Sequence, residues 1–123
     1  MKIVILNDIH IGPPLVYKGS VRAASHLAEN ALERVVKQIL HQHSPDLIIN
    51  LGDLIRSEYL DIDLKRYRSA IHQFHGLGCP VVHLIGNHEL KHMAIHQLEN
   101  IWAQEGFHQK SYGYMEFDQL RLS

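Results

Sequence analysis

Three short groups of polar residues, each directly after an apolar run, contain the residue types that bind metals and transfer protons. The groups are Asp8-Ile9-His10, Gly52-Asp53 and Gly86-Asn87-His88-Glu89. Carboxylate and amide oxygens and imidazole nitrogens coordinate divalent metals, and an imidazole also exchanges a proton near neutral pH. A glycine among them lets the backbone turn sharply or approach a ligand closely. The three groups predict one metal site if the fold brings them together.

The apolar runs before the three groups predict buried strands. They cover residues 2–6, 46–51 and 81–85 and are rich in Val, Ile and Leu, as expected for strands buried on both faces. The segments between them have the three- and four-residue apolar spacing of amphipathic helices. The order βαβαβ predicts parallel strands joined by right-handed crossovers. Ligands bind at the carboxyl ends of such strands, so the three groups should meet at one edge of the sheet.

The helix boundaries are predicted from capping residues. The first helix should cover residues 21–43 with Ser20 as its N-cap, because a serine side chain accepts hydrogen bonds from free backbone N–H groups. The second should begin at Asp61 or Asp63 and end at the glycines 76 and 78, which favour a helix C-terminus.

The C-terminal part of the chain predicts one more helix and two strands. The helix should cover residues 93–104, and its expected inward side chains are Ala94, Ile95, Leu98, Ile101 and Trp102. A strand over 112–117, a turn at Asp118-Gln119 and a strand from Leu120 should follow.

Composition narrows the class of protein. A chain of 123 residues fits one domain, and its net charge of −1 gives no indication of nucleic acid or of an anionic membrane as partner. The single cysteine, Cys79, excludes an intrachain disulfide and suits a reducing compartment. The sequence has no long apolar span and no signal-peptide pattern, so a cytoplasmic location is expected.

The three polar groups, in this order and each after a predicted strand, resemble the motifs of the calcineurin-like metallophosphoesterases. The family pattern is Asp-x-His, then Gly-Asp, then Gly-Asn-His followed by Asp or Glu. The resemblance extends over nearly the whole chain and implies an α/β fold that begins a two-sheet sandwich flanked by helices. The Gly-His-x-His motif of the family is absent, and no Gly-His dipeptide occurs. Residues 1–123 should therefore be the N-terminal portion of one such domain, incomplete at its C-terminus.

The resemblance also implies a role for each residue of the motifs. Asp8 and His10 would bind a first divalent metal, Asp53 would bridge two metals, and Asn87 would bind the second. His88 would protonate the leaving oxygen. The two ions, of Mn, Fe, Zn or Co, would activate a hydroxide that hydrolyses a phosphate monoester or diester of a small molecule or nucleotide.

Two positions depart from the family pattern. Arg56 stands where some branches have a second aspartate that orients the acid histidine. Arg56 could bind substrate phosphate through its planar guanidinium or be a solvated loop charge, and Glu89 could orient the histidine instead. Other histidines outside the motifs lack the family context and are not expected to be ligands; they are His83, His92, His96 and His108.

Two other interpretations remain open from the sequence. The chain could be a non-catalytic phosphoesterase-like module that acts through protein association, because an incomplete sandwich should expose an apolar sheet face and favour a homo-oligomer. A nucleotide-binding βαβ domain is disfavoured, since neither Gly-x-Gly-x-x-Gly nor Gly-x-x-x-x-Gly-Lys occurs.

Overall fold

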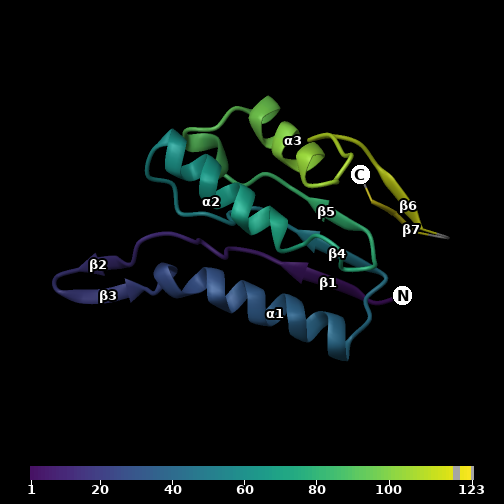
Figure 1. Ribbon diagram of the computed structural model, residues 1–123, viewed down its shortest axis with the longest axis horizontal. Coiled ribbons are helices and arrows are strands. Elements are labelled where there is room, and N and C mark those ends of the chain that lie inside the picture. The colour runs from purple at the N-terminus through teal and green to yellow at the C-terminus, as the bar shows by residue number, and fades with distance from the viewer. Residues whose placement is uncertain (118–119, 123) are drawn as a thin grey trace.

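A parallel sheet forms the centre of the computed structural model, which describes residues 1–117 and 120–122. Its three strands are β1 (Ile3–Leu6), β4 (Leu47–Asn50) and β5 (Val81–His83), in the order β1-β4-β5. Helices α1 (Ala28–Gln42) and α2 (Leu60–His72) connect them in turn (Figure 1). Both strand pairs are parallel. The predicted βαβαβ order and the α/β fold class are confirmed.

One face of this sheet carries the core. The register aligns Val4 with Ile48 and Ile48 with Val81, so these side chains lie on the same face. Ile48 and Val81 belong to a buried cluster with side chains of the helices. The members from α1 and α2 are Leu32, Val36, Ile39, Tyr67, Ala70 and Ile71. Helices α1 and α2 therefore cover the same face, as two right-handed crossovers in one direction require.

The opposite face is partly uncovered. Ile3 and Ile5 of the edge strand β1 are 36% and 59% exposed, and Leu84, just after β5, is also exposed. The exposed apolar surface that the sequence predicts is present at this face. The prediction that residues 2–6 form a strand buried on both faces is wrong, because β1 lies at the edge of the sheet.

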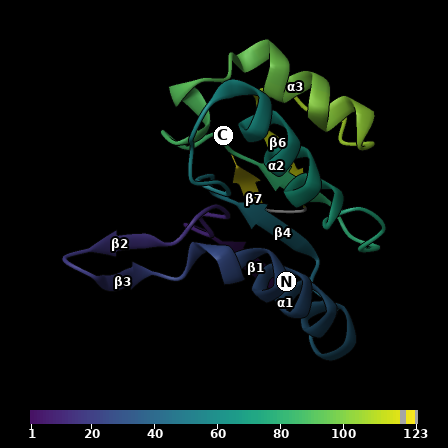
Figure 2. The ribbon, with the colours of Figure 1, turned by 60° about the vertical axis from the view of Figure 1, so that its left-hand side comes forward.

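A β-hairpin that the sequence reading missed lies between β1 and α1. Strands β2 (Leu15–Tyr17) and β3 (Ser20–Ala23) are antiparallel, and the hairpin projects from the body of the molecule (Figures 1 and 2). Lys18 and Gly19 in its two-residue turn have φ of 49° and 75°, the combination of a type I′ turn, whose twist matches that of paired strands. Ser20 is thus a strand residue, and the N-cap prediction is wrong.

The first predicted helix consequently begins later than expected. A 3-10 turn, η1 (Ser25–Leu27), precedes α1 at Ala28. The start at residue 21 was inferred from apolar spacing, but Val21 is exposed and pairs with Val16 across the hairpin. The local signal for a hairpin was a β-branched residue on each side of Lys18-Gly19, namely Val16 and Val21.

The other two helices also differ from prediction at their ends, and α2 ends at His72, before the predicted end at Gly76 and Gly78. Tyr59 is the N-cap of α2, and Asp61 and Asp63 lie in its first turn, where carboxylates stabilise the positive end of the helix dipole. The prediction that either aspartate caps the helix is wrong.

Helix α3 (Ile95–Gln104) begins two residues after the predicted start. Its side chains Leu98, Ile101 and Trp102 are buried as expected. Ala94 and Ile95 are exposed instead, because they lie at the start of the helix, before its buried residues begin at Leu98. The Trp102 indole donates a hydrogen bond of 2.8 Å to the Tyr67 hydroxyl and joins α3 to α2.

A second hairpin closes the described chain. Strands β6 (Met115–Phe117) and β7 (Leu120–Leu122) are antiparallel. The strand predicted from residue 112 thus begins at Met115. The predicted turn at Asp118-Gln119 and the final residue Ser123 lie outside the described residues.

His83 is an interior residue of the core and not a surface histidine. It is 0% exposed, and its ring makes aromatic contacts with Phe74, Phe107 and Trp102. Nδ1 lies 3.3 Å from the side-chain amide nitrogen of Asn50. Burial lowers the pKa of His83 from 6.5 to about 3, because the charged imidazolium is disfavoured away from water. The folded chain holds this imidazole neutral.

This buried imidazole should make stability depend on pH. Because the pKa of His83 is depressed in the folded state, the unfolded chain takes up the extra proton as pH falls below about 6.5. The contribution is complete above that value and is lost at about 1.4 kcal/mol per pH unit down to the folded pKa. His83→Phe keeps an aromatic ring and should remove this slope.

The measurement is the free energy of unfolding in urea at about pH 7 and about pH 5. All other titrating groups are shared, so the difference between the two proteins isolates His83. Equal losses of stability in both proteins would contradict the prediction.

Candidate metal centre

The carboxyl ends of the three parallel strands bring side chains from the three polar groups together. One ligand atom each from His10, Asp53 and His88 lies within 4.8 Å of the others. The rings of His10 and His88 meet edge to face, with centroids 4.7 Å apart. All three residues are half-buried. This places His88 among the groups able to hold an ion, whereas the sequence reading gave it a proton-donating role.

Asp8 and His10 reach this place through an unusual backbone. Strand β1 ends at Leu6, and Asp8 and His10 have φ of 54° and 53°. The backbone therefore does not continue as an extended strand at these two residues. Nevertheless, His10 Nε2 lies 3.3 Å from Asp8 Oδ1. Asp, Asn and His are the non-glycine residues that most often adopt positive φ.

The loop after β4 lies against this segment. Asp53 also has a positive φ, 52°, and its carbonyl accepts a 2.9 Å hydrogen bond from the His10 N–H. Asp53 Oδ1 accepts another from the His88 N–H, at 2.9 Å. Asp53 therefore contacts both neighbouring loops and lies at the centre of the site.

Glu89 organises the backbone around Asp53. Its side chain is 0% exposed and accepts hydrogen bonds from the backbone N–H groups of Asp53 (2.9 Å), Leu54 (2.8 Å) and Gly86 (2.8 Å). A longer one comes from Ile55, at 3.4 Å. Such charge-assisted bonds are about twice as strong as neutral ones. The sequence reading had Glu89 orienting the histidine side chain, but its carboxylate bonds to backbone N–H groups of the loops.

Two glycines permit this close contact of loops. Gly52 has a φ of +97°, and a Cβ there would lie 2.3 Å from the Gly86 nitrogen. A Cβ on Gly86 would lie 2.1 Å from Asp53 Oδ1. Real carbon atoms do not approach that closely, so both positions require glycine.

The other predicted residues are outside the cluster of His10, Asp53 and His88. Asn87 is exposed, in the same turn as Gly86 and His88. Arg56 is half-buried. Ser57 was missed by the sequence reading, and its Oγ lies 3.5 Å from His88 Nδ1. Its only sequence signal is that it follows the Gly-Asp group by a few residues.

The donor set fits a divalent cation. Within residues 1–117 and 120–122, the buried Nδ1 of His10 has no hydrogen-bond partner. Buried polar atoms are nearly always paired, so an orphaned one calls for a partner such as an ion. Imidazole nitrogen with carboxylate oxygen suits Mn, Fe, Zn and Co.

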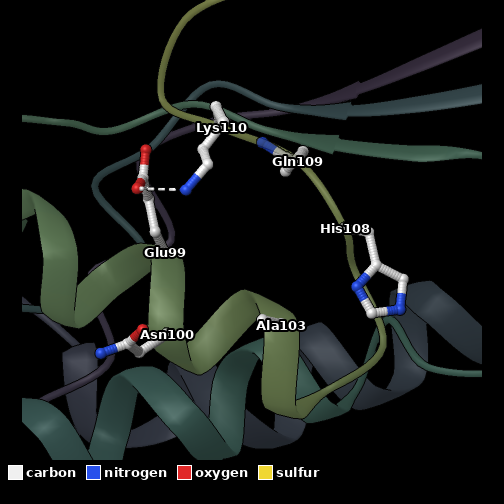
Figure 3. Close-up of a pocket in the computed structure, with 6 residues that line it drawn as sticks. All are labelled: Glu99, Asn100, Ala103, His108, Gln109 and Lys110. Carbon is white, nitrogen blue, oxygen red and sulfur yellow. Dashed lines mark hydrogen bonds and ion pairs between the residues drawn. The ribbon is translucent and has the colours of Figure 1, made fainter.

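A shallow hollow elsewhere does not belong to this cluster. It has a volume of about 260 Å³ and lies between α3 and the segment that follows it (Figure 3). Its lining residues are Glu99, Asn100, Ala103, His108, Gln109 and Lys110. None of them is a residue of the metal cluster, and Lys110 makes an ion pair of 3.3 Å with Glu99 across it.

Comparison with known proteins agrees with this geometry. A model of the calcineurin-like phosphoesterase family matches residues 1–122. The chain belongs to the calcineurin-like phosphoesterase family. Among solved structures, the chain is similar to a dimetal phosphatase from Danio rerio, with a TM-score of 0.63 and 16% identity. At that identity the likeness shows the fold.

The match covers 80% of this chain and 33% of the Danio rerio chain, so the chain spans about a third of that structure. No curated protein matches it. None of the described helices is long and apolar enough to span a bilayer.

Proposed function

We propose that residues 1–123 are the N-terminal portion of a phosphoesterase domain that hydrolyses phosphate monoesters or diesters with two divalent metal ions. The observation that carries this proposal is the convergence of His10, Asp53 and His88 from three strand ends. The family match supports phosphoester chemistry. Manganese as the metal, and a reducing cytoplasmic compartment suited to the single thiol of Cys79, are parts of the same proposal.

The metal ligands of this proposal follow the family motifs. Asp8 and His10 would hold one ion, Asn87 would hold the other, and Asp53 would contribute to both. The unpaired Nδ1 of His10 supports its role. When bound, such ions polarise phosphoryl oxygens and lower the pKa of water.

The chain's own residues supply orientation and a proton. His88 donates a proton to the leaving oxygen, and its position is held by the bond from its N–H to Asp53 Oδ1. Arg56 lies beyond Asp53 on the same loop and binds the substrate phosphate through its guanidinium. Glu89 keeps both loops in place through their N–H groups.

The test has two stages. Isothermal titration of the chain with Mn²⁺ and Zn²⁺ should detect binding. The complete protein containing this chain should then hydrolyse p-nitrophenyl phosphate or bis-p-nitrophenyl phosphate. Failure of both metal binding and hydrolysis would overturn the proposal.

A second candidate is a non-catalytic module that associates through its sheet. The exposed Ile3 and Ile5 on edge strand β1 favour it, since uncovered apolar strands at an edge promote pairing with another chain. A stable homo-oligomer in analytical ultracentrifugation, with no affinity for Mn²⁺ or Zn²⁺, is the result expected of this module.

A further inference from the structure

Asp63 is a buried carboxylate that the proposed ligand set does not use. Its side chain is 0% exposed, in the first turn of α2. Burying a carboxylate is unfavourable unless both oxygens find partners. Here both do, and the two partners come from different loops.

The first partner lies on the loop after β4. Asp63 Oδ1 accepts a 2.9 Å hydrogen bond from the N–H of Glu58, a neighbour of Ser57, whose hydroxyl lies 3.5 Å from His88 Nδ1. Arg66, one turn along α2, adds an ion pair to Glu58 and donates to the Arg56 carbonyl at 3.4 Å. The start of α2 therefore fixes this segment at two points.

The second partner lies on the loop after β5. Asp63 Oδ2 lies 2.8 Å from His92 Nδ1. His92 follows the 3-10 turn η2 (Glu89–Lys91), whose N-cap is His88. If Asp63 only stabilised the start of α2, its bond to the Glu58 N–H would be explained. Its bond to His92, which lies on the loop after β5, would not.

We propose that Asp63 is a positioning residue of the metal centre, which holds the turn carrying His88 against the loop carrying Asp53 by bonding His92 and Glu58 at once. This role rests on the proposed function for its chemical purpose. Residues behind metal ligands fix the orientation of those ligands, and their loss commonly weakens metal affinity by about 10- to 100-fold.

The experiment changes His92 and leaves the buried carboxylate in place. His92 is 36% exposed, so its replacement should leave the fold intact. His92→Ala removes the donor to Asp63, and His92→Gln displaces it by one carbon. His92→Asn keeps an N–H donor at the δ position and should restore the bond.

The matched control is another histidine–carboxylate pair on α2. His72 Nδ1 lies 2.7 Å from Glu105 Oε2 at the C-terminal end of the helix, remote from the strand ends that form the site. His72→Ala should leave metal affinity unchanged.

Two readouts decide the outcome. The affinity for Mn²⁺, followed by electron paramagnetic resonance of the free ion, should fall by about 10-fold or more in His92→Ala and His92→Gln, and stay near wild type in His92→Asn and His72→Ala. In the metal-free chain, nuclear Overhauser contacts between the rings of His10 and His88 should weaken in His92→Ala and His92→Gln. They should stay unchanged in His92→Asn and His72→Ala.

Several results would overturn the role of Asp63. They are wild-type Mn²⁺ affinity in His92→Ala, an equal loss in the His72 control, or unchanged ring contacts. If the wild-type chain binds no Mn²⁺, the affinity readout gives way to the ring contacts, which alone then decide whether Asp63 positions His88; the proposed function is judged separately by Zn²⁺ binding and hydrolysis.

Discussion

Asp53→Asn is expected to lower the affinity of the chain for Mn²⁺ by about 100-fold or more, since loss of a direct ligand should exceed the 10- to 100-fold typical of groups behind the ligands. Within residues 1–117 and 120–122, Asp53 is the carboxylate that converges with His10 and His88. An amide there keeps the shape of the side chain but removes its negative charge, which offsets the charge of the ions.

This substitution should leave the fold intact. Asparagine tolerates the positive φ of 52° at this position, and its carbonyl can still accept the His88 N–H that Asp53 Oδ1 accepts at 2.9 Å. Calorimetric titration with Mn²⁺ and thermal unfolding measure the two effects separately.

Asp46→Asn is the matched control for charge. Asp46 is exposed, and its carboxylate accepts from the Lys2 N–H at 2.6 Å, at the far end of the sheet from the site. Its replacement should not alter Mn²⁺ binding. Unchanged affinity in Asp53→Asn would contradict the proposal that Asp53 is a metal ligand.

Glu89→Ala should produce the largest loss of stability. Its buried carboxylate is bonded by the N–H groups of Gly86, Asp53, Leu54 and Ile55, and without it these groups lose their charged acceptor. Hydrogen bonds to charged groups contribute about 1.5–3 kcal/mol each, so we expect a loss of roughly 3–5 kcal/mol. That is a large part of the roughly 5–15 kcal/mol that stabilises a typical domain.

The free energy of unfolding in urea measures this loss. Glu89→Gln should also destabilise the chain, because its NH₂ group would face backbone donors. The control is Glu33→Gln on the exposed face of α1, where Glu33 pairs with Lys37 one turn away, and little change is expected. A Glu89→Ala protein as stable as wild type would show that these bonds do not hold the loops together.

Local sequence was sufficient for the elements with long, regular patterns. The three apolar runs became β1, β4 and β5, and the helical spacing between them became α1 and α2. The prediction was wrong at the hairpin around Lys18-Gly19, because apolar residues at helical spacing there belong in part to strand β3. Short apolar segments fit either period, so turn chemistry had to decide between them.

The neighbourhood of the site shows a similar division. The contacts of Ser57 and Asp63 could not be predicted from the sequence. Ser57 lies near His88 and Asp63 near His92, and each partner is about 30 positions away in the chain. No local pattern encodes such a pair.

By itself the sequence determined which strand ends carry metal-binding and proton-transferring groups, because strand order and the glycine positions follow from local chemistry. Only the tertiary structure decided how those groups meet. The positive φ values of Asp8, His10 and Asp53, and the carboxylate of Glu89 on the surrounding N–H groups, exist only when the loops pack against one another. The turn Gly86-Asn87-His88-Glu89 thus contributes His88 to the candidate metal centre and, through Glu89, supports Asp53.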